Sequence, residues 1–216
     1  MKPKIIIFDF DGTLGDTRHN IIVTLQATMR DRGLELRTDE ECASTIGLTL
    51  FDSFRTMYPT MSDVEAEACV SHYRDIFYRS IEESIPQLFA GVAPTLARLR
   101  DMGVVMTIAS SRSTPSLLLF LKSMGVVDHF SLVFGSDSVE NHKPHPEAVL
   151  LTLEKLGFEP CEALVVGDMP VDILMARNAA VRSVGVSYGN ATREELEASG
   201  ADFVIDSFTE LLDIIK

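Results

Sequence analysis

Short apolar runs alternate with longer amphipathic stretches along most of the chain. Runs of strand length that are almost continuously apolar lie at residues 5–8, 104–109, 132–134, 163–166, 181–186 and 203–205. Such runs are typical of parallel strands buried on both faces. Helical patterning separates them, at residues 93–100, 115–124, 146–156, 171–178, 193–198 and 208–214. The alternation predicts an α/β fold, a Rossmann-like doubly wound parallel sheet built from right-handed βαβ units.

One stretch breaks this alternation. From residue 16 to residue 86 no run is convincing as a strand. Apolar residues near its start are spaced as on one helix face, at Ile21, Ile22, Leu25 and Met29. Further helices are predicted at residues 39–45, 50–57 and 63–81. We therefore predict an inserted all-helical cap domain over residues 16–86, and a Rossmann-like core formed by residues 1–15 and 87–216.

Composition narrows the class of protein. The chain has 216 residues, of which 46% are hydrophobic and 24% charged, so it can bury a sizeable core. Its net charge of −13 argues against a broad basic face, so we expect no nucleic-acid partner. No apolar run approaches the roughly 18 residues of a membrane span, so no membrane partner is expected. Cys42, Cys69 and Cys161 lack CxxC spacing and are interpreted as reduced thiols of a cytoplasmic protein.

The strongest chemical signal is the string DFDGTLGDT, which directly follows the first predicted strand. Ligands of open α/β sheets bind outside the carboxyl ends of the strands, so Asp9 and Asp11 can project into one crevice. Carboxylates this close repel each other unless a cation lies between them, and their oxygen atoms suit Mg²⁺. Gly12 permits a tight turn, and Thr13 offers a hydroxyl and an amide to a phosphate oxygen. A capped turn is the alternative interpretation, and the full string favours the ligand site.

A second acidic pair ends another predicted strand, in the string LVVGDMPVDI. Asp168 is the candidate third carboxylate of a metal site, and Asp172 is a candidate supporting partner, through water or a neighbouring ligand. Pro170 is compatible with a helix that begins there. The alternative is that Asp168 caps this helix while Asp172 is solvated in its first turn.

The string MTIASSRS ends a strand with polar side chains. The hydroxyl and amide of Ser110 can bind a phosphate oxygen, and Ser111 and Arg112 lie beside it. Serines that follow a strand are usually caps or turns, so this signal is weak by itself.

The string HKPHPE contains a candidate cation. Pro144 disfavours the helical backbone conformation at Lys143, which favours an extended or turn conformation there. A lysine fixed in this way can direct its charge to a phosphate and to Asp9, although most lysines are solvated surface charges. His142 and His145 have no thiol near them and lack the spacing of a zinc site, so they are interpreted as loop residues.

Together these strings resemble the haloacid dehalogenase-like hydrolase superfamily and, within it, the phosphoglycolate phosphatase-like group. DFDGTLGDT, a strand that ends in Ser110, KPHPE and GDMPVDI occur in the superfamily's order and span almost the whole chain. The helical insertion lies where this group carries its cap. The resemblance implies a Mg²⁺-dependent phosphatase whose substrate is a small phosphorylated metabolite similar to phosphoglycolate.

The resemblance also implies roles for individual residues. Asp9 is implied to be the nucleophile that forms an aspartyl-phosphate, and Asp11 to protonate the leaving alcohol and then activate water. The metal is implied to be held by a carboxylate oxygen of Asp9, the backbone carbonyl of Asp11, and Asp168, with Asp172 in support. The transferred phosphoryl group is implied to be held by Ser110 and Lys143.

Some positions depart from the group's pattern. Ser111 replaces the usual asparagine, and Met169 and Pro170 stand where small or polar residues are commoner. Dehalogenase members lack the aspartate at the position of Asp11, so its presence favours phosphate chemistry. The cap's specificity loop resembles residues 45–50, TIGLTL. The candidate substrate-binding residues are Thr13, Ser111, Arg112 and Gly47.

Other functions stay open at this point. A phosphotransferase similar to β-phosphoglucomutase would use the same core and pass the phosphoryl group to a sugar. A non-catalytic module that binds phosphorylated ligands would be expected to lack Asp9 or Asp11, and both are present. A phosphonate hydrolase would need a cap lysine, and residues 16–86 contain none. The expected assembly is a monomer or a homodimer.

Overall fold

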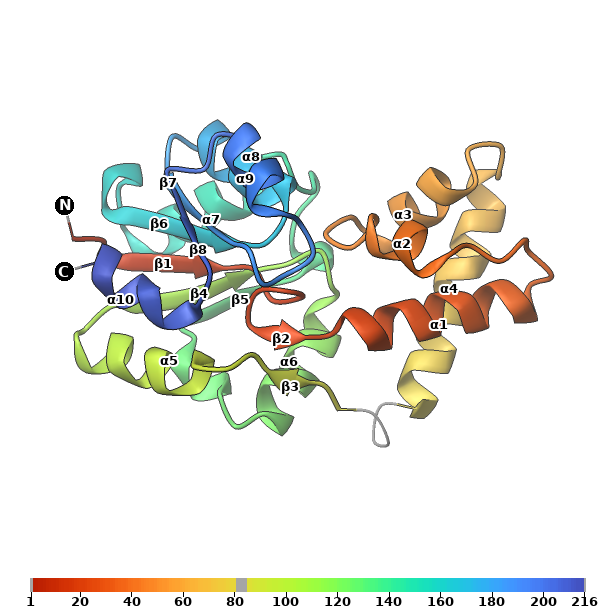
Figure 1. Ribbon diagram of the computed structural model, residues 1–216, viewed down its shortest axis with the longest axis horizontal. Helices are drawn as coiled ribbons and strands as arrows, with labels where there is room; N and C mark the ends of the chain where they lie inside the picture. Colours follow the sequence, from red (N-terminus) through yellow and green to blue (C-terminus); the bar gives the residue numbers. More distant parts are fainter. Residues whose placement is uncertain (1, 81–84, 216) are drawn as a thin grey trace.

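The computed structural model describes residues 2–80 and 85–215 and confirms the predicted α/β class (Figure 1). In this part of the chain the main sheet is parallel, with strand order β5-β4-β1-β6-β7-β8. Its strands are β1 (Ile5–Phe8), β4 (Val105–Ala109), β5 (Leu132–Phe134), β6 (Ala163–Gly167), β7 (Arg182–Val186) and β8 (Phe203–Ile205). The chain builds outward from β1 to β5 and then returns to β6 beside β1. The strand order therefore reverses between β1 and β6, which is where doubly wound sheets bind ligands.

Helices cover both faces of this sheet (Figure 1). One face carries α7 (Glu147–Leu156), α8 (Pro170–Asn178) and α9 (Arg193–Ala198), and the other carries α5 (Val92–Asp101), α6 (Thr114–Ser123) and α10 (Leu211–Ile214). Strand β1 shows why both faces are covered. Ile5 and Ile7 belong to the apolar cluster under α7 and α8, whereas Ile6 and Phe8 belong to the cluster under α5 and α6. Because successive side chains of a strand point to opposite faces, a continuously apolar strand requires both layers.

The predicted helical insertion lies beyond the carboxyl ends of the strands (Figure 1). It consists of α1 (Arg18–Asp31), α2 (Asp39–Ala43), α3 (Leu50–Met57) and α4 (Asp63–Ser80). Helix α4 packs against both α1 and α3. The helix predicted at 63–81 is thus confirmed to Ser80, and its last residue, Ile81, lies outside the described residues. The insertion is a cap of four helices among the residues that the structure describes.

The chain enters and leaves the cap through a short antiparallel ribbon. Strand β2 (Gly15–Asp16) pairs with β3 (Gln87–Leu88). The expectation that no strand occurs from residue 16 onward was therefore wrong at Asp16, because a strand of two residues has no detectable hydrophobic period. The domain boundaries proposed from the sequence stay a prediction.

Other differences from the sequence-based elements are small. The helix predicted at 208–214 divides into η5 (Phe208–Glu210) and α10, and the helix predicted at 39–45 ends at Ala43. Further short 3₁₀ helices are η2 (Val127–His129), η3 (Ser136–Ser138) and η4 (Pro160–Glu162). Among the described residues, none of the helices combines the length and the apolar character needed to cross a membrane.

Candidate active site

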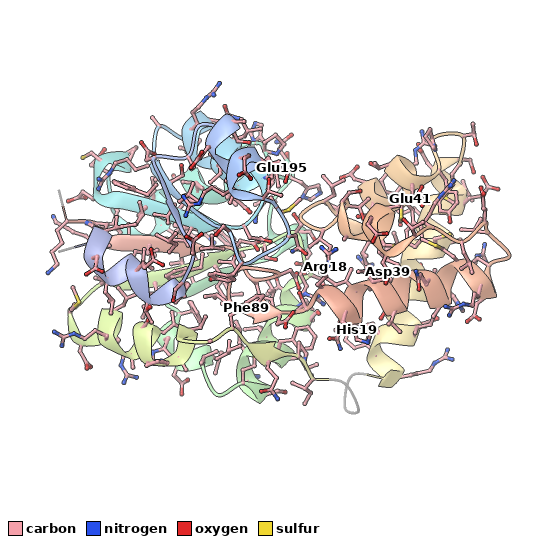
Figure 2. All side chains as sticks on the ribbon, in the orientation of Figure 1. Arg18, His19, Asp39, Glu41, Phe89 and Glu195 are labelled. Atoms are coloured by element: carbon pink, nitrogen blue, oxygen red, sulfur yellow. The ribbon has the colours of Figure 1, made fainter. Side chains whose placement is uncertain are left out.

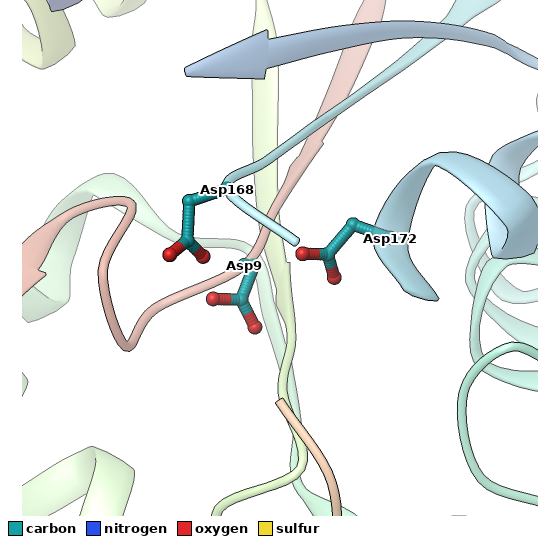
Figure 3. Close-up of side chains that lie close together, drawn as sticks. All are labelled: Asp9, Asp168 and Asp172. Carbon is teal, nitrogen blue, oxygen red and sulfur yellow. The ribbon is translucent and has the colours of Figure 1, made fainter. Parts of the chain in front are cut away.

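Three carboxyl groups meet where the strand order reverses. Asp9 directly follows β1, Asp168 directly follows β6, and Asp172 lies in the first turn of α8. One oxygen of each lies within 4.8 Å of the others, and Figure 3 shows the three groups around a common space. They are 6%, 0% and 1% exposed. Carboxylates this close and this buried repel one another, so the arrangement needs positive charge.

Lys143 supplies part of that charge. Its Nζ atom lies 2.5 Å from Asp9 Oδ1 and 2.6 Å from Asp172 Oδ1. The lysine side chain is 4% exposed, so both ion pairs are shielded from water. Lys143 lies in the turn before α7, and its peptide bond to Pro144 is cis. One ammonium group among three carboxylates leaves two negative charges without a partner when all four groups are ionised.

The pKa values of these groups reflect the excess of negative charge. Burial raises the pKa of Asp9 well above its usual range, and the attraction of Lys143 does not outweigh it. Burial, with repulsion from Asp172, raises the pKa of Asp168 to about 7. Burial lowers the pKa of Lys143, but the attraction of Asp172 and Asp9 is stronger, so this pKa is raised overall. A divalent cation in the common space would balance the charges and keep all three carboxylates ionised.

The surroundings of Asp168 fit such a cation. Asn190 donates to Asp168 Oδ2 from its backbone nitrogen at 2.7 Å and from Nδ2 at 2.8 Å. Thr13 donates to Asp168 Oδ1 at 3.2 Å. These bonds fix the carboxylate, as outer partners of metal-binding side chains commonly do. Carboxylate oxygens are the ligands that Mg²⁺ prefers.

Gly12 makes this packing possible. Its φ angle is +87°, and a Cβ atom there would lie 2.1 Å from Asp168 Oδ2 and 2.3 Å from Asn190 Nδ2. The tight turn predicted from the sequence is therefore present. Only glycine fits both the backbone angle and the space.

Asp11 lies outside the acidic cluster and pairs with Arg112. The guanidinium donates to Asp11 Oδ1 at 2.7 Å from Nη2 and to Oδ2 at 3.0 Å from Nε. Arg112 also donates to Ser116 Oγ at 2.9 Å and lies over the rings of Phe120 and Phe77, at 4.8 and 5.4 Å from their centroids. The arginine predicted to bind substrate thus holds Asp11 in this structure. The metal contact predicted for Asp11, through its backbone carbonyl, stays a prediction.

A cavity of about 270 Å³ separates the core from the cap. Asp9, Asp11, Ser110 and Arg112 line it from the core side. Ser110 accepts a hydrogen bond from the Arg112 backbone nitrogen at 3.2 Å, which orients its hydroxyl group beside the cavity. The predicted nucleophile and the predicted proton carrier therefore share one space that can hold a ligand.

The cap rests on the core at the positions that depart from the group's pattern. Ser111 donates to the backbone oxygen of Gly47 at 2.6 Å. A Cβ atom at Gly47, whose φ angle is +98°, would lie 3.3 Å from Met169 Cγ. Ser111 and Gly47 also line the cavity, as expected for substrate-binding residues. Thr13 does not line it and directs its hydroxyl to Asp168, so its predicted phosphate contact stays a prediction.

Two functional candidates escaped the sequence analysis. Asn190, which holds Asp168, also accepts from Arg18 Nη1 at 3.3 Å; Figure 2 places Arg18 where the core meets the cap. The signal available was its position in the loop after β7, at the same edge of the sheet as Asp9 and Asp168. Arg74 of α4 also lines the cavity, and a surface arginine on an amphipathic helix gave no local signal.

These features define an α/β protein with an acidic centre at the reversal of its sheet and a helical cap above it. Comparison with known proteins narrows the class. Residues 6–186 match the haloacid dehalogenase-like hydrolase family, and the chain belongs to this family, in its phosphoglycolate phosphatase-like group.

Three similar proteins illustrate the relationship. The chain is 34% identical to the probable phosphatase IndB of Dickeya dadantii, covering 98% of this chain and 93% of that one. It is 34% identical to a phosphoglycolate phosphatase of Vibrio vulnificus, covering 98% and 96%. The structure of a haloacid dehalogenase-like hydrolase from Bacteroides fragilis superimposes with a TM-score of 0.93 at 30% identity, covering 97% and 100%. The chain is an enzyme of the family's phosphatase group.

Proposed function

We propose that the protein is a Mg²⁺-dependent phosphatase that hydrolyses a small phosphorylated metabolite, similar to phosphoglycolate, through an aspartyl-phosphate on Asp9. One observation carries this proposal: Asp9 lines the cavity and also faces Lys143 and the other two carboxyl groups of the acidic cluster. A carboxylate placed in this way can reach a ligand while its charge is offset. Relatives named phosphatases support the same reaction.

The reaction proceeds in two steps on this chain's own residues. An oxygen of Asp9 attacks phosphorus, the bond from phosphorus to the ester oxygen breaks, and Asp11 gives its proton to the departing oxygen. Asp11 then takes a proton from water, whose oxygen attacks the phosphorus, and phosphate leaves as Asp9 is restored. Lys143 offsets negative charge beside Asp9 throughout. Mg²⁺ would be held by a carboxylate oxygen of Asp9, the backbone carbonyl of Asp11, and Asp168, with Asp172 in support, and would supply further positive charge for the phosphoryl group.

Phosphate release from p-nitrophenyl phosphate tests the proposal. We expect activity with Mg²⁺, loss of activity in EDTA, and a decrease in kcat of about a thousandfold or more in Asp9→Asn, because the nucleophile is removed. Asp101→Asn, at an exposed aspartate of the core, is the matched control and should keep wild-type activity. Wild-type turnover by Asp9→Asn would overturn the mechanism. Isomerisation of a hexose phosphate without phosphate release would favour the phosphotransferase instead.

The cysteines bear on the cellular location of the protein. Among the described residues Cys42, Cys69 and Cys161 are free thiols, and two of them are buried. We propose a cytoplasmic protein on this basis, since free thiols are common where the environment is reducing. The monomer or homodimer expected from the sequence stays a prediction.

A further inference from the structure

The cavity of about 270 Å³ is lined by residues of both the core and the cap, so its cap wall bears on the part of the substrate beyond the phosphate. On the cap side, most hydroxyl groups that line it already have partners within the cap. Thr45 donates to Cys42, Ser53 donates to Thr49, and Thr49 donates to Asp52. The cap wall therefore offers few polar groups to a ligand, and those few are the candidates for recognising it.

One face of α4 runs along this cavity. It contributes Glu67, Val70, Tyr73, Arg74, Phe77 and Tyr78. The spacing of these residues is that of a single helical face. Phe77 contacts the Arg112 guanidinium that holds Asp11. Arg74 precedes Phe77 by three residues, about 4.5 Å along the helix axis. Arg74 therefore lies about one helical turn from Phe77, the residue of α4 that contacts the Arg112 guanidinium.

Arg74 differs from the other strong cation of the cavity wall. The side chain of Arg112 is 9% exposed and already donates to both oxygens of Asp11 and to Ser116. Arg74 is exposed and forms no ion pair with a carboxylate that the structure describes. Arg74 attracts Asp137 only weakly: burial raises the pKa of Asp137, but hydrogen bonds from Thr114 and, to a smaller extent, the charge of Arg74 lower this pKa overall. The guanidinium can therefore turn to a ligand at little cost.

The negative charge of the cavity wall indicates a role for this arginine. Four carboxylates line the cavity, from Asp9, Asp11, Glu67 and Asp137. A substrate that carries a second anion besides its phosphate would be repelled by this wall. A guanidinium within reach offsets the repulsion and can bind a carboxylate or a phosphate through two parallel hydrogen bonds.

We propose that Arg74 binds a second anionic group of the substrate, a carboxylate or a second phosphate, a short distance from the phosphate that is removed. The proposal rests on the proposed phosphatase function and assigns the selectivity of the same site. It makes the substrate a small anion with two charged ends and makes Arg74 the cap residue that recognises the second end.

Matched substrates test this assignment. The pair 2-phosphoglycolate and 2-hydroxyethyl phosphate differs only in a carboxylate, and the pair pyrophosphate and methyl phosphate differs in a second phosphate. We expect wild type to prefer the doubly charged member of one pair. Arg74→Gln should lower kcat/KM for that member by roughly tenfold to a hundredfold, mainly through KM, because a charge-assisted hydrogen bond is lost. If the variant loses activity on 2-phosphoglycolate the second group is a carboxylate, and if it loses activity on pyrophosphate the second group is a phosphate.

The controls separate recognition from folding and from chemistry. Arg74→Gln should lower kcat/KM for the singly charged member far less than for the doubly charged member, and Arg74→Lys should retain part of the preference. Arg79→Gln removes an exposed arginine of the same helix that does not line the cavity. It should change kcat/KM for neither member of the pair. An equal loss on both members, or no preference in wild type, would overturn the role of Arg74. Absence of phosphate release from every substrate would instead overturn the proposed phosphatase.

Discussion

Removing Lys143 should show how strongly the acidic cluster depends on its single cation. Lys143→Met keeps a long apolar side chain but leaves Asp9 and Asp172 without their ion pairs of 2.5 and 2.6 Å. Breaking a buried ion pair from one side costs about 3–5 kcal/mol. Protonation of one aspartate recovers part of this cost, because a buried unpaired charge neutralises where it can. We expect a decrease in the free energy of unfolding of about 3 kcal/mol at pH 7.5, at the lower end of that range.

A double-mutant cycle attributes this loss to the ion pair. Asp172→Asn removes one buried charge, so the double variant Lys143→Met/Asp172→Asn should be more stable than Lys143→Met alone. We expect an interaction energy of at least about 1 kcal/mol between the two sites, as is found for contacting groups. Lys4→Met is the control, because Lys4 forms an ion pair with Glu162 at the surface and is 68% exposed. Exposed pairs contribute about 1 kcal/mol or less.

Urea unfolding in EDTA measures these differences. Far-UV circular dichroism is the suitable signal, since the chain has no tryptophan. A loss of about 3 kcal/mol corresponds to a decrease in Tm of roughly 6–12 °C for a chain of this size. The reasoning fails if Lys143→Met behaves like Lys4→Met, or if the effects of the two cluster substitutions simply add.

A further substitution and a change of pH probe the same site. Gly12→Ala places a Cβ atom 2.1 Å from Asp168 Oδ2 at a φ angle of +87°. We expect the free energy of unfolding to fall by about 2 kcal/mol or more and most of the affinity for Mg²⁺ to be lost. A wild-type affinity in calorimetric titration would contradict this expectation. Without metal, stability should fall as the pH rises from about 4 to 7, because the raised pKa of Asp168 makes the folded state bind more protons than the unfolded state there. Saturating Mg²⁺ should remove that decrease and Asp168→Asn should weaken it, whereas a flat Tm profile in EDTA would count against the buried charge.

The positions of Asp9 and Asp168 at one edge of the sheet could be predicted from the sequence, because the strands that precede them are recognisable. Parallel strands buried on both faces leave continuous apolar runs, and their carboxyl ends share one edge. Asp9 and Asp168 follow neighbouring strands in register, with Phe8 opposite Val166. A local pattern shows that a carboxylate ends a strand, but it does not show which strands are neighbours. Strands β1 and β6 are neighbours because the chain returns to the other side of β1 after β5, and this strand order is a property of the whole fold.

The contacts of Arg112 could not be anticipated in the same way. Its sequence neighbours suggested a loop that meets substrate, whereas the folded chain directs it to Asp11, 101 residues earlier. The link between Ser111 and Gly47 spans 64 residues and joins the core to the cap. This second contact depends on the angle at which the cap meets the core, and no hydrophobic period records that angle.

Arg74 shows most clearly which functional residues a sequence pattern does not reveal. Helix α4 needs an apolar face to pack against α1 and α3, and that requirement alone accounts for the alternation of apolar and charged residues along it. An arginine beside the apolar face therefore looks like a solvated charge in the sequence. Only the position of the cap above the strand ends brings it to the cavity that Asp9 also lines. The groups proposed to react follow strand ends that the sequence marks, whereas the arginine proposed to select the substrate lies on a helix whose sequence pattern is already explained by packing. If Arg74 selects the substrate as proposed, single substitutions on α4 will change the selectivity of this enzyme and leave both the sheet and the acidic centre intact.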